Sequence, residues 1–61
     1  MATSNELYEQ IESAFEDFQE NHKKFVGKGV KAAGTRARKS IGEIKKLVTA
    51  YRQASVSESK S

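Results

Sequence analysis

The residues with the clearest chemical potential in this sequence are its lysines and arginines, which crowd into its second half. All 11 of them follow residue 22, where only Glu43 and Glu58 accompany them as acids. The first 22 residues hold six acids and neither lysine nor arginine. Such a separation of charge between the two halves of a chain indicates that the basic half binds a polyanion.

A helix through the basic half would gather most of these cations on one side. At about 100° per residue, seven cations lie within about 80° of Lys31, with no acid among them. The seven are Lys28, Lys31, Arg38, Lys39, Lys45, Lys46 and Arg52. Arg36 flanks the group, and the small residues Thr35, Gly42 and Thr49 lie between its members. Because cations on a smooth helix surface approach phosphates and displace their counterions, we expect the seven, with Thr35 and Arg36, to bind DNA.

The kind of partner follows from what the basic side lacks. A merely solvated helix face is expected to carry acids interspersed among its cations, and this face has seven cations and no acid. An acidic protein, a membrane surface and simple solubility remain as alternatives. Recognition of individual bases is not favoured. Asn and Gln side chains pair with adenine, and Gln53 is the one amide side chain near the cations. The aromatic residues fall on apolar stripes, which disfavours stacking on single strands. The phosphate backbone of duplex DNA, bound without regard to sequence, is therefore the expected ligand.

Two amphipathic helices must position these residues. Thr3 and Glu6 have the spacing of a capping box, so residues 1–3 are expected to form a cap. Apolar residues every three or four positions then predict a helix over about 4–25. Gly27 and Gly29 predict a turn at 26–29, and a second apolar stripe predicts a helix over about 30–54. The polar segment 55–61 is expected to be a disordered tail. The fold class predicted is all-α, an antiparallel two-helix hairpin.

Self-association is expected because 61 residues without cysteine or a metal-binding cluster make a marginal monomer. The second helix has a heptad series that runs through Val30, Gly34, Ala37, Ile41, Ile44, Val48 and Tyr51. One partner helix cannot cover both this series and the first helix's aromatic residues, so we predict a homodimer that forms a four-helix bundle. The predicted interface residues are Phe15, Phe18, Ile41, Ile44, Leu47, Val48 and Tyr51.

Other function classes find little support in the sequence. His22 has no cysteine to activate and lies on the apolar stripe of the first helix. No catalytic residue, cofactor or metal site is therefore predicted, and an enzyme is not expected. No apolar run approaches the roughly 18 residues that cross a bilayer. The expected location is the cytoplasm or the nucleoid. A coiled-coil adaptor, whose heptad series docks a partner helix, is the alternative function.

The segment from Lys31 to Lys39, KAAGTRARK, and its continuation through IGEIKKL to Tyr51 and Arg52 resemble the bacterial histone-like nucleoproteins best known from chlamydiae. The resemblance implies a helical region that binds DNA without sequence preference and compacts the chromosome. It assigns six cations to DNA, namely Lys31, Arg36, Arg38, Lys39, Lys45 and Lys46. This sequence departs from the chlamydial members, which have a long Lys/Ala-rich tail, and DNA binding is expected through its helical part.

Overall fold

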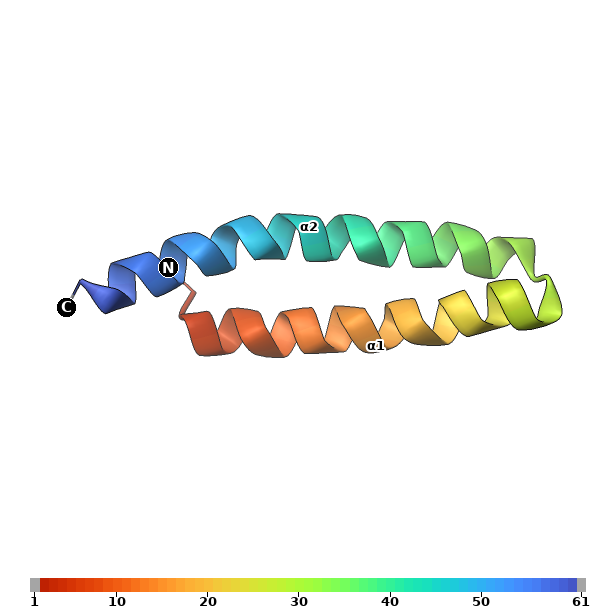
Figure 1. The fold of residues 1–61 in the computed structure, drawn as a ribbon, viewed down its shortest axis with the longest axis horizontal. Coiled ribbons are helices and arrows are strands. Elements are labelled where there is room, and N and C mark those ends of the chain that lie inside the picture. The colour runs from red at the N-terminus through yellow and green to blue at the C-terminus, as the bar shows by residue number, and fades with distance from the viewer. Residues whose placement is uncertain (1, 61) are drawn as a thin grey trace.

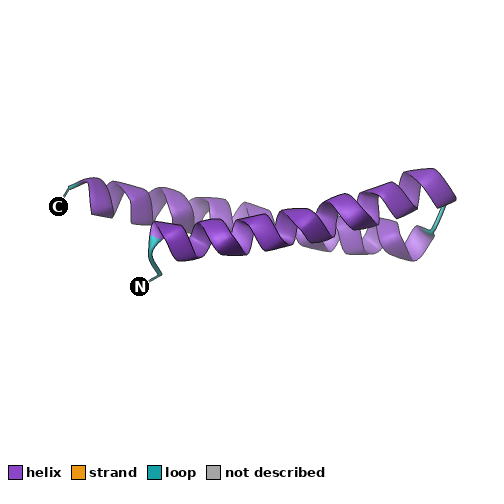
Figure 2. Ribbon diagram, turned by 90° about the horizontal axis from the view of Figure 1, so that it is seen from below, coloured by secondary structure: helices purple, strands orange, loops and turns teal. Residues whose placement is uncertain are grey.

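Two long helices, antiparallel and joined by a tight turn, make up the protein. The computed structural model describes residues 2–60, in which α1 covers Ser4–Lys28 and α2 covers Lys31–Ser59 (Figure 1). The helices lie side by side as a rod of 48 × 14 × 14 Å and cross at a shallow angle (Figure 2). The described residues contain no strand. The predicted all-α antiparallel hairpin is therefore confirmed.

Both ends of α1 follow from local backbone chemistry. The Thr3 hydroxyl accepts a hydrogen bond from the Glu6 N–H at 3.2 Å, which satisfies one of the unpaired donors of the first turn. Gly29 ends the helix in the left-handed region, with φ of 69°, and its N–H bonds to the Phe25 carbonyl. The connection consists of Gly29 and Val30 alone and is shorter than the turn predicted at 26–29.

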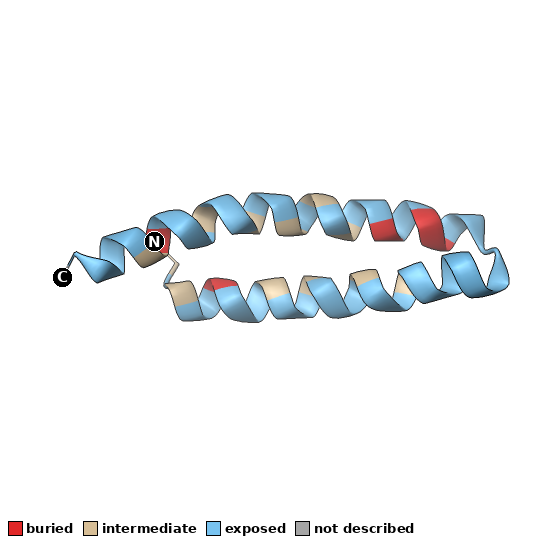
Figure 3. Cartoon of the chain, in the orientation of Figure 1, coloured by how far each residue is buried: buried red, intermediate tan, exposed pale blue. Residues whose placement is uncertain are grey.

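The core is a narrow seam between the helices (Figure 3). α1 contributes large side chains to it, with Leu7 only 5% exposed and Phe18 half-buried. α2 contributes small side chains, and Ala33, Ala37 and Ala54 are its buried apolar residues. Burial of a leucine side chain stabilises a fold by about 1.5–3 kcal/mol. Large side chains on one helix against small ones on the other allow the two backbones to pack closely.

The seam of α2 follows only part of the predicted heptad series, in which Gly34 and Ala37 are buried and Ile44 is half-buried. Val30, Ile41 and Val48 belong to that series, yet they are 39%, 46% and 44% exposed. The residues that face α1 instead include Ala33 and Leu47, the latter half-buried. Two adjacent series on α2 have heptad spacing, and the one that packs carries the smaller side chains near the turn. Ile41 and Val48, which lie off this seam, remain on the surface.

The C-terminal segment differs from its expected disorder, because α2 continues through residues 55–59. Its last turn is held by Glu58, whose carboxylate accepts hydrogen bonds from the Ser4 N–H at 2.7 Å and the Ser4 hydroxyl at 2.6 Å. These two bonds hold the pKa of Glu58 below its ordinary value, since they favour the ionised form. A contact between residues 54 positions apart thus orders a segment that is locally polar. Met1 of the predicted cap and Ser61 of the predicted tail lie outside the described residues.

Candidate nucleic-acid interface

The cations of α2 lie on one continuous helix, which runs without a break from Lys31 to Ser59. At about 100° per residue, five of them lie within about 80° of the direction opposite Ile44, a residue half-buried against α1. These five are Lys31, Arg38, Lys39, Lys45 and Lys46, and all are exposed. Arg52 is exposed at one margin of the group. We call these six residues the basic face.

The basic face consists of two rows of cations. Lys31, Arg38, Lys45 and Arg52 follow one another every seven residues, or about 10.5 Å, and form the first row. Lys39 and Lys46 form the second row, with the same seven-residue spacing. Thr35, Gly42 and Thr49 lie between the two rows. The Thr35 hydroxyl accepts a hydrogen bond from Arg38 Nη2 at 3.2 Å, which turns this guanidinium toward the space between the rows.

Acids within the same molecule do not neutralise the basic face. Among residues 2–60, the one ion pair within 4.0 Å joins Lys24 Nζ to Glu20 Oε1 at 3.2 Å, and both residues belong to α1. The helical period explains this arrangement. Four acids of α1 lie within about 40° of the direction opposite the buried Leu7 and so point away from α2. These acids are Glu9, Glu12, Glu16 and Glu20.

Two of the predicted DNA-binding residues lie apart from the basic face. Arg36 lines a groove between the helices together with Asp17, Glu43 and Lys39 of the basic face, and no ion pair within 4.0 Å joins Arg36 to either acid. Lys28 is predicted to group by helical period with the cations of the second helix, but it is the last residue of α1. The turn at Gly29 and Val30 interrupts the helical period on which that prediction relied. Lys28 is nonetheless exposed, close to the first turn of α2.

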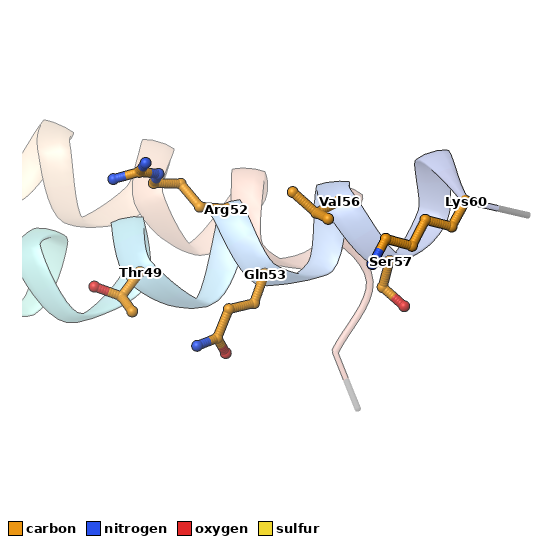
Figure 4. Close-up of a pocket in the computed structure, with 6 residues that line it drawn as sticks. All are labelled: Thr49, Arg52, Gln53, Val56, Ser57 and Lys60. Carbon is orange, nitrogen blue, oxygen red and sulfur yellow. The ribbon is translucent and has the colours of Figure 1, made fainter.

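The basic face gives way to uncharged polar groups toward the C-terminus. A shallow depression there is lined by Thr49, Arg52, Gln53, Val56, Ser57 and Lys60. Figure 4 shows Thr49 and Gln53 projecting from the same side of α2, with Arg52 pointing the other way. Arg52 was a predicted DNA-binding residue. Gln53 was considered for base reading alone, and Ser57 was not predicted because it lies in the expected tail at 55–61. Continued helical period past residue 55 is the signal that extends this surface.

The described residues offer little for other chemistry. No group of three or more His, Cys, Asp or Glu side chains within residues 2–60 is arranged to hold a metal ion. The ring of His22 stacks on that of Phe18, with centroids 5.8 Å apart, and Phe18 stacks on Phe15 at 6.2 Å. No helix in this part of the chain is both long and apolar enough to span a membrane.

The two amphipathic helices carry opposite charge on their outer surfaces. This arrangement identifies the chain as a small, basic, all-helical protein. The sequence model of the family Histone H1-like protein Hc1 matches residues 5–61. The chain therefore belongs to this histone-like family, as its resemblance to the chlamydial nucleoproteins indicated. Searches of curated proteins and of solved structures returned no match.

Proposed function

We propose that this protein binds duplex DNA through the basic face of α2, without sequence preference, and organises DNA in the nucleoid. The support is twofold. The chain belongs to a family described as histone H1-like. The basic face is exposed and no acid within residues 2–60 pairs with it. The second observation carries the proposal, because a row of cations that repel one another is stabilised by an anionic partner.

The chemistry of the interaction is neutralisation of phosphates and release of their counterions. From Lys31 to Arg52 the first row extends about 31 Å, close to the 34 Å of one duplex turn. The small residues between the rows let the backbone of one strand approach the helix surface. Thr49 and Gln53 add uncharged donors beyond Lys46, which suits contacts to phosphate and sugar rather than to bases.

A salt titration tests the proposal. Fluorescence anisotropy on two unrelated duplexes is expected to give equal affinities and a log–log salt slope of about −4 to −6. In the double variant Lys45→Ala/Lys46→Ala, loss of two phosphate contacts is expected to reduce the magnitude of the slope by about 2. The matched control is Lys23→Ala/Lys24→Ala, which removes the same charge from α1 and is expected to leave the slope unchanged.

Several outcomes would reject the proposal. Binding that does not respond to salt, or no binding at low salt, excludes phosphate neutralisation as its source. Equal effects of the two double variants would show that only net charge matters and that the basic face is not the site. Circular dichroism on each variant separates loss of binding from loss of the helices.

An adaptor that docks a partner helix is a second candidate, favoured by the exposure of Ile41 and Val48. This function predicts the opposite pattern of mutational effects. Ile44→Asp would abolish partner capture, whereas Lys45→Ala/Lys46→Ala would leave it intact.

A further inference from the structure

The isolated hairpin exposes more surface than a compact protein of its size. Its accessible surface is 4837 Å², whereas a compact monomer of 6.8 kDa exposes about 4,000 Å². The excess is close to the roughly 800 Å² that each partner buries in an interface of standard size. The excess accessible surface of the rod is therefore about the area that would be buried by one protein partner.

Large apolar side chains are exposed on one side of the rod. Phe15 and Tyr8 on α1 are 47% and 54% exposed, and Ile41 and Val48 on α2 are 46% and 44% exposed. Tyr8 and Phe15 are seven residues apart, as are Ile41 and Val48, so each pair forms one line along its helix. We call these four residues the apolar face.

The α1 residues and the α2 residues of the apolar face lie on the same side of the rod, because the opposite side is a polar groove that both helices line. Asp17 and Asn21 of α1 share a groove with Arg36 and Glu43 of α2, which fixes one flank of each helix on a common polar side. In an antiparallel pair the remaining flanks also share a side. Those flanks carry the apolar face.

Charges at the margins of the apolar face decide which partner fits. Beside Ile41 and Val48 runs the first row of the basic face, four cations with no acid among them. The matching margin of α1, next to Phe15, carries Glu12 and the neutral Gln19. One margin is thus strongly basic and the other weakly acidic, so the apolar face is complementary to a second copy of itself.

Two symmetric pairings of identical rods through this face are possible. If α2 packs on the partner's α2, the two four-cation rows line the same edge and repel one another. If α1 packs on the partner's α2, each cation row lies beside Glu12 and Gln19 of the other chain. We propose that two copies pair in the second way, about a two-fold axis parallel to the helices, with both turns at the same end.

This pairing fixes the positions of the basic faces. In the resulting four-helix bundle, neighbouring helices alternate between α1 and α2, so the two α2 helices occupy diagonally opposite corners. Their basic faces then point in opposite directions. We infer, on the basis of the proposed function, that one dimer holds two duplexes together, one at each basic face, and does not coat a single duplex.

The pairing itself is tested by cysteine cross-linking, since the chain has no cysteine of its own. Phe15→Cys and Val48→Cys are prepared as separate proteins and oxidised alone and as a mixture. The expected result is a disulfide-linked heterodimer in the mixture and no dimer from either protein alone, because like residues lie on diagonal helices beyond disulfide reach. Self-linking of Phe15→Cys would establish the α1–α1 pairing and overturn the proposal. So would the absence of any cross-link.

Bridging is tested with an immobilised duplex and a labelled free duplex. The protein is expected to capture the labelled duplex on the beads. Val48→Glu, which places a charge in the apolar face, is expected to reduce capture at least tenfold while it still binds a single duplex. Gln10→Glu adds the same charge outside the apolar face and is the control, expected to capture normally. Single-duplex binding without capture by the wild-type protein overturns the bridging inference alone, whereas loss of single-duplex binding overturns the proposed function.

Discussion

The two helices of this hairpin are similar in length and opposite in almost every other respect. α1 carries six acids and three lysines, while α2 carries seven lysines and arginines and two acids. α1 supplies the large seam residues Leu7 and Phe18, and α2 supplies the small ones Ala33, Ala37 and Ala54. Packing and charge are thus divided between the two helices. α1 provides the bulk of the core, and α2 presents the cations.

The difference in charge also explains why the cations stay available. Salt bridges between the helices would be expected from helices of opposite charge, yet the acids of α1 are mostly on its outer side. Asp17 of α1 lines a groove with Arg36 and Glu43 of α2, but no ion pair within 4.0 Å joins the two helices within residues 2–60. Although Lys39 of the basic face also lines this groove, no acid within residues 2–60 forms an ion pair with the basic face.

The largest effect is expected from truncation of the core on α1. Leu7→Ala removes the one large side chain that is buried in the described structure and should lower the free energy of unfolding by about 2–3 kcal/mol. For a rod with so small a core, this loss is expected to leave the protein substantially unfolded at 25 °C. Urea titration followed by circular dichroism measures the effect, with the exposed Gln10→Ala as control. A cost below 1 kcal/mol would show that α1 is not the source of the packing energy.

Replacement of glycine by alanine on α2 should strain the packing at one position and stabilise the protein at another. A Cβ at Gly34 would lie 2.8 Å from Phe25 Cδ1 and 2.9 Å from Cε1, whereas a Cβ at Gly42 meets nothing within 4 Å. Both glycines are within α2, where alanine favours the helix by about 1 kcal/mol. Gly42→Ala is expected to stabilise the protein by that amount. Gly34→Ala is expected to be less stable than Gly42→Ala by about 1–2 kcal/mol, because the Phe25 ring must move. Equal melting temperatures would contradict the close approach.

Reversal of charge on α1 would remove the electrostatic difference between the helices. Glu9→Lys/Glu16→Lys converts the outer acids of α1 to cations and should steepen the salt slope of DNA binding by about 1–2. The neutral control is Glu9→Gln/Glu16→Gln, which is expected to change the slope little. Anisotropy titrations at several salt concentrations provide the measurement. An unchanged slope for the lysine variant would mean that DNA never approaches the outer surface of α1.

The smallest effect is expected at the open end of the rod. Since the pKa of Glu58 is below its ordinary value of 4.5, its contribution to stability is present above that pH and is lost as the pH falls through the lowered pKa. The melting temperature of Glu58→Gln should therefore lie slightly below that of the wild type at pH 7. The difference should shrink toward zero in acid. Thermal melts at pH 7, 5, 4 and 2 test this, and a gap that is unchanged at pH 2 would contradict the role of the carboxylate.

Local patterns were sufficient to predict the architecture. The Thr3 cap, the glycines at the turn and the apolar periods together predict two antiparallel helices, because each is a property of neighbouring residues. The seam of α2 was not predictable in the same way. Two heptad series were available, and the choice between Ile41 and Leu47 as seam residues depends on close packing against α1.

The candidate site shows the same division. The convergence of Lys31, Arg38 and Lys45 on one side of a helix follows from spacing alone. The groove that Arg36 lines with Asp17 depends on how α1 packs against α2. The helical state of residues 55–59 depends on the Ser4–Glu58 hydrogen bonds, which no local pattern encodes. What the sequence could not supply is contact between distant residues.

The pair of hydrogen bonds between Ser4 and Glu58 has a consequence for how the protein folds. The Phe25–Gly34 contact closes a short loop beside the turn, whereas the Ser4–Glu58 bonds join residues 54 apart. Loop closure costs more entropy as the loop lengthens, so the rod is expected to zip from the turn toward its free ends. Amide hydrogens should consequently exchange slowest around Ala33 and Ala37 and fastest in the terminal turns of both helices, which open and reclose while the turn end stays intact.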